Sequence, residues 1–316
     1  MTTRAFIFPG QGSQAIGMGK ALADAFASAR SVFEEIDDSL SQKLSRTMWE
    51  GPESDLTLTE NAQPAIMAAS IAVIRVLEKE AGFDIAKHAR LVAGHSLGEY
   101  TALCAAGAFA LADAARLLKA RGQAMQAAVP VGEGGMSALL GAEIEQAEVL
   151  AEECAAATNG ICVVANDNAP GQVVISGSKA AIDKAPEIAK AKGIKRAMAL
   201  NVSAPFHSPL MQPAADKMRE ALAQVTIRPP AVPVVANVTA AEVSEPDTIR
   251  RLLVEQVTGR VRWRESVLAF RALGVDTTVE AGGAKVLTGM VKRTDKELAN
   301  VTLDTVADIE AFAKTL

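Results

Sequence analysis

The sequence predicts an α/β protein in which a larger domain with a mainly parallel sheet contains a smaller inserted domain. First, short apolar segments typical of buried strands alternate with helical patterns over residues 1–128. Second, the character changes at residues 130–135, which read PVGEGG and are rich in turn formers. Third, the next segments have the order strand–helix–strand–strand–helix–strand, which is the ferredoxin-like unit (βαββαβ).

The elements of the larger domain follow from periodicity. A strand over residues 5–8 ends in Pro-Gly, and a second strand over residues 91–93 is followed at once by a helix. In the longest helical pattern Ile66, Val73 and Leu77 recur on one side. The helices expected in this part of the chain cover residues 18–26, 31–40, 64–80, 97–106 and 111–128.

The smaller domain is expected over residues 129–202, between two parts of the larger domain at 1–128 and 203–316. Residues 166–171 read NDNAPG, and these turn formers are expected to connect its two middle strands. Its strands are predicted at 136–140, 161–165, 172–176 and 195–201, and its helices at 144–157 and 180–192. The larger domain then continues with a helix near 213–225, a strand near 233–236, and helices near 247–256 and 263–273.

Composition limits the possible functions. The 316 residues suffice for a large and a small domain, and 49% apolar with 22% charged residues indicates a globular chain. A net charge of -5 lacks the basic excess of nucleic-acid-binding proteins. No signal peptide and no run of ~20 apolar residues is evident, so neither a membrane span nor a membrane partner is expected. The three cysteines lack metal-ligand spacing, which indicates free thiols and no metal site in a cytoplasmic protein that we expect to be a monomer.

The strongest chemical signal is residues 94–98, which read GHSLG and fit the G-x-S-x-G pattern. The pattern lies between a predicted strand and a predicted helix, as a nucleophile on a sharp strand-to-helix turn requires. The helix N-terminus there favours negative charge nearby. The competing interpretation is an ordinary glycine-flanked turn, but the setting favours Ser96 as the nucleophile of covalent acyl transfer.

A nucleophilic serine needs a base, and the chain has three histidines. His88 lies in a charged run typical of a solvated surface. His95 adjoins Ser96, and neighbours on a strand point to opposite faces, so His95 is badly placed to take the proton. His207 lies in an irregular segment bounded by prolines, and such segments often carry functional residues. The sequence therefore predicts His207 as the base, against the alternative of a histidine satisfied within a loop.

Residues 10–14 read GQGSQ and follow the first strand directly, so backbone and amide donors there are candidates to face an oxyanion. A rival interpretation is the dinucleotide-binding pattern G-x-G-x-x-A, which Gly10, Gly12 and Ala15 match. That pattern needs a second strand that ends in an acidic residue ~20 positions on. Glu34 and Glu35 fall in a predicted helix instead, so no dinucleotide cofactor is expected.

Arg121 is the most informative charge. It falls on the apolar face of the helix at 111–128, three residues after Leu118 and four before Met125. A guanidinium on a buried face needs a partner. Two possibilities remain open from the pattern alone, namely an internal salt bridge with an aspartate or glutamate and an anionic substrate.

These residues resemble a family, the malonyl-CoA:acyl carrier protein transacylases of fatty acid synthesis. The resemblance covers nearly the whole chain and rests on several ordered motifs. The matching segments are residues 8–14 (FPGQGSQ), 94–100 (GHSLGEY), 121–126 (RGQAMQ), 170–175 (PGQVVI), His207 and 285–289 (KVLTG). The chain departs at residues 280–284 (EAGGA), where the family usually has a proline after the first glycine, and a local loop difference is expected there.

The resemblance implies an α/β-hydrolase-like larger domain beside the ferredoxin-like one, and it implies roles. Ser96 would be the nucleophile and His207 the base. Arg121 would hold the free carboxylate of a malonyl group. It also implies that Gln11 and the backbone of Leu97 form the oxyanion hole, that the carbonyl of Gln256 steadies the histidine, and that Phe206 favours malonyl over methylmalonyl groups.

The resemblance further implies that malonyl-CoA is a substrate and that an acyl carrier protein is the partner, with no cofactor. Candidate basic contacts for an acidic carrier are Lys192, Lys195, Arg196, Lys292 and Arg293. Three alternatives remain: a serine hydrolase or thioesterase, a trans-acting polyketide acyltransferase, and a binding module that keeps only the fold. The long chain segment after His207 counts against a true α/β-hydrolase, in which the histidine lies near the end. The pairing of Ser96 with His207 counts against the binding module.

Overall fold

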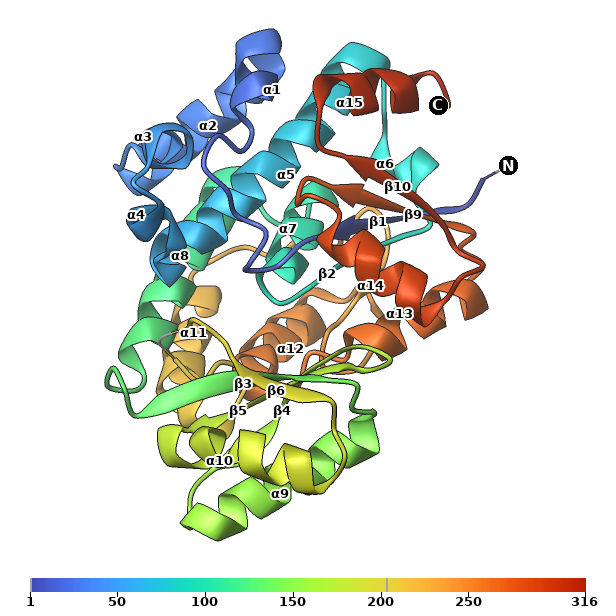
Figure 1. The fold of residues 1–316 in the computed structure, drawn as a ribbon. Coiled ribbons are helices and arrows are strands. Elements are labelled where there is room, and N and C mark those ends of the chain that lie inside the picture. Colours follow the sequence, from blue (N-terminus) through green and yellow to red (C-terminus); the bar gives the residue numbers. More distant parts are fainter. Residues whose placement is uncertain (1, 203) are drawn as a thin grey trace.

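The computed structural model describes residues 2–202 and 204–316, and within these ranges the strands form two separate sheets (Figure 1). The larger sheet has the order β10-β9-β1-β2-β7-β8. Neighbours from β10 to β7 are parallel, and only β8 is antiparallel to its neighbour. The bounds are β1 Arg4–Phe8, β2 Leu91–Gly94, β7 Val234–Val235, β8 Glu242–Val243, β9 Thr277–Ala281 and β10 Ala299–Leu303. The expected α/β class with a mainly parallel sheet is confirmed.

Both faces of the larger sheet are covered, and strand β1 shows how. Phe6 and Phe8 point into one apolar core, whereas Ala5 and Ile7 point into another. All four side chains are fully buried, as in a parallel sheet between helical layers. The first core receives α2 Ala27–Leu40, α5 Thr59–Ala81, α7 Leu97–Ala105, α8 Leu111–Ala127, α11 Gln212–Ala223, α12 Pro246–Thr258 and α15 Val306–Ala313, and the second receives α13 Trp263–Ala272 and α14 Val286–Thr294.

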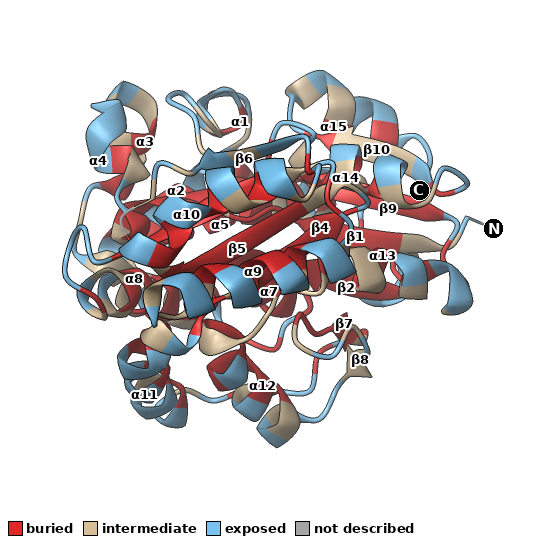
Figure 2. Ribbon diagram, turned by 60° about the horizontal axis from the view of Figure 1, so that its bottom comes forward, coloured by how far each residue is buried: buried red, intermediate tan, exposed pale blue. Residues whose placement is uncertain are grey.

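The smaller sheet is antiparallel, with the order β4-β5-β3-β6. Its chain order, β3–α9–β4–β5–α10–β6, is the predicted one. Helices α9 and α10 cover one face and turn exposed sides outward (Figures 1 and 2), while Met136, Ala138 and Val174 on the other face join the core of the larger sheet. The bounds are β3 Gly134–Leu140, α9 Ile144–Thr158, β4 Cys162–Ala169, β5 Gln172–Ser178, α10 Lys179–Ala191 and β6 Arg196–Ala199. Ser203, where the larger domain was expected to resume, lies outside the described residues.

The prediction that residues 166–171 form a connecting turn is wrong for most of that segment. Strand β4 continues to Ala169, and only Pro170 and Gly171 form the turn. Two of its polar side chains have partners outside their own sheet. Asp167 forms an ion pair with Arg264 of α13 (2.8 Å), and Asn168 Oδ1 lies 2.8 Å from His95 Nε2. These contacts join β4 to α13 and to the turn after β2. They stabilise an extended conformation for residues that would otherwise favour a turn.

Several boundaries differ from the predictions. Helix α5 begins at Thr59, five residues before Pro64, because the carbonyl of Leu58 accepts hydrogen bonds from the backbone N–H groups of Asn61 and Ala62. Strand β9 was not predicted, since the buried Glu280 interrupts its apolar pattern. Elements that sequence patterns also did not assign are α3 Leu44–Glu50, α4 Glu53–Thr57, α6 Ile85–His88, β8, α14, β10 and α15. No helix in the described ranges is both long and apolar enough to span a membrane.

Candidate active site

Ser96 lies on the turn between β2 and α7, with φ 54° and ψ -111°. A non-glycine residue in this region is strained and needs support. The turn closes because Gly94 and Gly98 flank it: a Cβ at Gly94 would lie 1.9 Å from the carbonyl oxygen of Gly98, and one at Gly98 would lie 2.2 Å from that of Phe8. The backbone N–H of Ser96 donates to Asn237 Oδ1 (2.7 Å), which fixes the strained turn.

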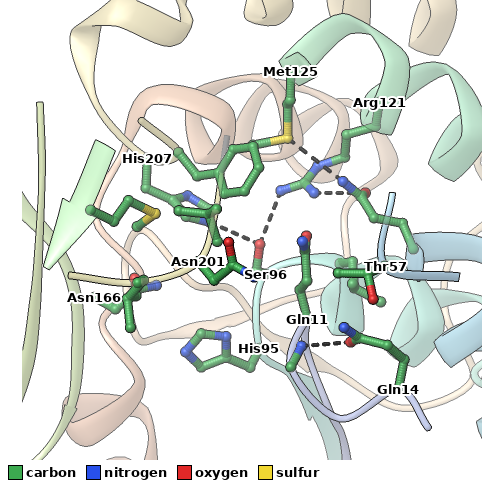
Figure 3. Close-up of a pocket in the computed structure, with 17 residues that line it drawn as sticks. Gln11, Gln14, Thr57, His95, Ser96, Arg121, Met125, Asn166, Asn201 and His207 are labelled. Atoms are coloured by element: carbon green, nitrogen blue, oxygen red, sulfur yellow. Dashed lines mark hydrogen bonds between the residues drawn. The ribbon is translucent and has the colours of Figure 1, made fainter. Parts of the chain in front are cut away.

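His207 reaches Ser96 from a separate loop. Its Nε2 lies 2.8 Å from Ser96 Oγ (Figure 3). Its Nδ1 lies 2.8 Å from the carbonyl oxygen of Gln256 and 3.1 Å from that of Gly259. Carbonyl oxygens only accept, so Nδ1 carries the proton and Nε2 is left as the acceptor for the serine hydroxyl. The Gln256 carbonyl is free to accept because it lies in the last turn of α12.

The environment keeps His207 neutral. Its side chain is 3% exposed. Burial, together with the nearby Arg121 charge, lowers the pKa of His207 to about 3, although the hydrogen bonds that Nδ1 donates to the carbonyl oxygens of Gln256 and Gly259 oppose the shift. The other histidines do not contact Ser96 Oγ: His95 Nε2 bonds Asn168, and His88 Nδ1 lies 2.9 Å from the carbonyl oxygen of Asp84.

Arg121 is 1% exposed and lies opposite His207 across the serine hydroxyl (Figure 3). Its Nη2 donates to Ser96 Oγ (3.1 Å) and Gln256 Oε1 (2.8 Å), and its Nη1 donates to Gln63 Oε1 (2.8 Å). The guanidinium carbon also lies 5.6 Å from the ring centre of Tyr100. Within residues 2–202 and 204–316 it forms no ion pair with a carboxylate, so the alternative of an internal salt bridge is wrong.

The approach of α8 to α5 places Arg121 beside Gln63. Gly122 makes this possible, since a Cβ there would lie 2.5 Å from the Cα of Glu60 and 2.7 Å from the carbonyl oxygen of Thr59. The two helices therefore pack backbone to backbone next to the guanidinium. This explains why a glycine follows the arginine in the sequence.

The remaining predicted residues line one cavity of about 300 Å³ around Ser96. Leu97 begins α7 and is buried, Gln11 is half-buried on the loop after β1, and Phe206 is 7% exposed beside the histidine. Residues of the smaller sheet contribute Met136 and Asn166 to the opposite wall. The cavity is therefore shared between the two sheets. The described part of the chain holds no cluster of histidine, cysteine and carboxylate side chains suited to a metal.

Sequence patterns missed a buried polar group behind the serine. Glu99 is 2% exposed, and its Oε2 accepts from the backbone N–H of Asn237 (3.1 Å) and from Gln256 Nε2 (2.8 Å). Burial raises the pKa of Glu99 to about 7, although these hydrogen bonds and Arg121 oppose the shift. A sequence signal existed, because Glu99 is the only charged residue of α7.

This arrangement is suited to covalent acyl transfer. A hydroxyl bonded to a neutral imidazole is an activated nucleophile, and the imidazole is oriented by carbonyl oxygens instead of a carboxylate. A buried cation bonded to the same hydroxyl oxygen favours an anionic group near the reacting atom. The cavity can thus hold an acyl group that carries its own negative charge.

Comparisons with known proteins agree with the geometry. A family model described as "Acyl transferase domain" matches residues 5–310. The chain is 44% identical over 316 residues to the malonyl CoA-acyl carrier protein transacylase of Bacillus subtilis strain 168, covering 100% of this chain and 98% of that one. The crystal structure of an acyl-carrier-protein-S-malonyltransferase from Bartonella henselae superposes with a TM-score of 0.96 at 55% identity, over 99% of each chain.

A further similar structure contains a partner. It shows a type II PKS acyl-carrier protein in complex with its malonyl-transacylase. The present chain is similar to it with a TM-score of 0.95 and 39% identity, and each chain is covered over 100% of its length.

Proposed function

The chain belongs to the acyl transferase family and to its malonyl CoA-acyl carrier protein transacylases, and from this we propose that it transfers a malonyl group from malonyl-CoA to the phosphopantetheine thiol of an acyl carrier protein. One observation carries the proposal. The hydroxyl oxygen of Ser96 lies 2.8 Å from His207 Nε2 and 3.1 Å from Nη2 of the buried Arg121. Nucleophile, base and carboxylate-binding cation therefore meet at one atom.

In the first half-reaction His207 Nε2 takes the proton of Ser96 Oγ, and Oγ attacks the thioester carbonyl of malonyl-CoA. The carbonyl oxygen becomes an oxyanion facing the backbone N–H of Leu97 and the Gln11 loop. The C–S bond then breaks, and the imidazolium returns the proton to the coenzyme A thiolate. The product is a malonyl ester on Ser96.

The second half-reaction runs the same steps in reverse with a different thiol. His207 takes the proton of the phosphopantetheine thiol, and the thiolate attacks the serine ester. The C–O bond breaks, and the proton passes back to Ser96 Oγ. The backbone carbonyl of Gln256 keeps the imidazole in the required tautomer throughout, since it accepts from Nδ1 (2.8 Å).

Selection of the acyl group falls to Arg121 and Phe206. A planar guanidinium binds a carboxylate through two parallel hydrogen bonds, and Arg121 has no carboxylate of the described chain on it to displace. Phe206 is buried beside the base at the cavity wall, where its ring restricts a branched acyl group such as methylmalonyl.

We further infer a division into an α/β-hydrolase-like catalytic domain, residues 1–128 and 203–316, and a ferredoxin-like domain, residues 129–202. The two separate sheets support it, and so does the apolar cluster between the smaller sheet and helices α9 and α10, whose residues all belong to the smaller domain. The protein is proposed to act as a cytoplasmic monomer without a cofactor, with free cysteines consistent with a reducing compartment.

The carrier is proposed to serve fatty acid synthesis. The alternative is a polyketide carrier, because one similar structure is a complex with a type II PKS carrier protein. A competition assay with both classes of holo-carrier separates them through the ratio of their specificity constants.

The direct test is intact-protein mass after mixing with malonyl-CoA, acetyl-CoA or methylmalonyl-CoA. The parent protein is expected to gain one malonyl group, and Ser96→Ala is expected to gain none. Added holo-carrier should remove the group from the parent far faster than water does. A full-strength adduct on Ser96→Ala contradicts the mechanism, and release to water at the carrier rate indicates a thioesterase.

A further inference from the structure

Glu99 is a buried carboxylate that no step above uses. It is the only charged residue of α7, and it faces away from the cavity behind the serine turn. Its Oε2 accepts two hydrogen bonds, from the backbone N–H of Asn237 and from Gln256 Nε2. Burial of an ionised carboxylate that is 2% exposed costs free energy unless neighbouring groups pair with it or donate hydrogen bonds to it.

The side-chain amide of Gln256 lies between Glu99 and Arg121. Its Nε2 donates to Glu99 Oε2 (2.8 Å) and to the carbonyl oxygen of Ser96 (2.9 Å), and its Oε1 accepts from Arg121 Nη2 (2.8 Å). If the amide were turned by 180°, its Nε2 would face Nη2 of Arg121, which is also a donor, and its Oε1 would face Oε2 of Glu99, which is also an acceptor. The carboxylate on one side and the guanidinium on the other therefore fix the same amide orientation.

The other contact of Glu99 reaches the nucleophile. Asn237 donates its backbone N–H to Glu99, accepts the N–H of Ser96 at Oδ1 (2.7 Å), and donates Nδ2 to the carbonyl oxygen of Gly94 (2.6 Å). Glu99 thus connects the support of the serine turn with the support of the guanidinium. Of the three hydrogen bonds of Asn237, only the one to Glu99 is strengthened by charge when the carboxyl is ionised.

Glu99 contacts Arg121 only through the amide of Gln256, and this separation has a chemical advantage. A carboxylate bound directly to Arg121 would occupy the N–H groups that a substrate carboxylate needs, and it would repel that substrate. Placed beyond one amide, Glu99 in its ionised form offsets part of the buried positive charge, and with a pKa of about 7 this form is about half of the molecules at neutral pH. The described chain still leaves the guanidinium without an ion-pair partner.

We infer that Glu99 is a positioning residue for selection of the malonyl group, which holds Arg121 in its substrate-binding orientation through the amide of Gln256. The inference rests on the proposed function, because it assumes that Arg121 binds the malonyl carboxylate.

Two variants of Glu99 separate the effect of its hydrogen-bond acceptor from the effect of its charge. Glu99→Ala removes the acceptor, so Gln256 loses a charge-assisted hydrogen bond, and the ratio of kcat/KM for malonyl-CoA to that for acetyl-CoA should fall about tenfold. Glu99→Gln keeps an oxygen acceptor without the charge, and its ratio should fall only about threefold. A purely structural defect would lower both specificity constants together and leave the ratio unchanged.

A double-mutant cycle with Arg121→Ala tests whether the effect passes through the guanidinium. In that background, either Glu99 substitution should change the ratio by less than about twofold. Glu280→Gln is the matched control, because Glu280 is also buried and accepts the N–H groups of Leu287 (3.0 Å) and Thr288 (2.7 Å) away from the cavity. Its ratio should equal that of the parent.

The outcomes are distinct. A parent that forms no malonyl adduct overturns the proposed function and this inference with it. A parent that forms the adduct, with Glu99 variants whose ratio matches the parent or whose ratio falls equally without Arg121, overturns the inference alone. If Glu99→Ala does not fold, the Glu99→Gln pair decides: a threefold loss that needs Arg121 supports the role, and no loss overturns it.

Discussion

Replacement of Arg121 by alanine is the most informative perturbation of the cavity. The guanidinium is 1% exposed and donates only to neutral oxygen atoms in the described chain, so a malonyl carboxylate would be its one anionic partner. Loss of one partner of a desolvated, hydrogen-bonded charge pair costs about 2–5 kcal/mol. At about 1.4 kcal/mol per factor of ten, kcat/KM for malonyl-CoA should fall by about thirtyfold to several thousandfold.

The value of kcat/KM for acetyl-CoA should not fall in Arg121→Ala. Acetyl has no carboxylate, so it leaves the buried guanidinium without an anion, and Arg121→Ala removes that penalty. Acetyl transfer should therefore hold or rise. Arg121→Lys should restore malonyl transfer only in part, because an ammonium lacks the planar fork that binds a carboxylate through two bonds.

The assay is the ratio of specificity constants for malonyl-CoA and acetyl-CoA, measured for the parent and each variant. Arg116→Ala is the matched control, since it removes the same charge from the same helix at a side chain that is 55% exposed and paired with Asp113. An unchanged ratio in Arg121→Ala would refute the reasoning and move carboxylate recognition to another residue.

Three further predictions concern the base and the carrier. His207→Ala should slow both half-reactions about a hundredfold or more, while His88→Ala behaves as the parent; a damaging His88→Ala would refute the assignment. Because burial and Arg121 lower the pKa of His207 to about 3, Nε2 stays unprotonated, and acylation by the uncharged acetyl group should change less than about twofold between pH 7.5 and 5.5 in a stopped-flow assay. A histidine of ordinary pKa would instead lose most of its rate as pH falls through ~6.5. Added salt should weaken transfer to the carrier more than acylation by malonyl-CoA, and equal sensitivity would count against contact with the exposed cations Lys195, Arg196, Lys292 and Arg293.

Among the basic contacts predicted from the sequence, Lys192 is the least available. Its ammonium is paired with Glu153 at 2.6 Å, and its side chain is 25% exposed. Arg293 donates to Gln172 Oε1 of β5 (2.9 Å), so it lies where α14 meets the smaller sheet. Substitution of Lys195 and Arg196 is therefore the cleaner test of carrier binding.

The sequence predicted those parts of the fold whose apolar periodicity is local. Strand β1, strand β2 and the helix that carries Arg121 are found within a residue or two of their predicted bounds. The segment 166–168 is a strand and not the predicted turn, because the side chains of Asp167 and Asn168 bind Arg264 and His95, which are distant in sequence. Strand β9 was missed for a related reason, since the N–H groups of α14 satisfy its buried Glu280.

The same distinction applies to the cavity. Ser96 and Arg121 stand out locally, one by its glycine-flanked turn and the other by its place on an apolar helix face. The partners that orient them do not stand out. Gln63, Asn237 and the side chain of Gln256 are ordinary polar residues whose roles appear only when distant segments meet. Glu99 was visible as a charge in an apolar helix but had no predicted partner.

Arg121 has a second effect on the proposed reaction, because its positive charge helps to lower the pKa of His207. A bound malonyl carboxylate would cancel much of that charge, so the imidazole would become a stronger base when the correct substrate is present. Acetyl would leave the charge and the weak base as they are. Arg121 therefore favours malonyl over acetyl in two ways. Its guanidinium forms hydrogen bonds with the malonyl carboxylate, and neutralisation of its charge by that carboxylate makes His207 a stronger base for the activation of Ser96.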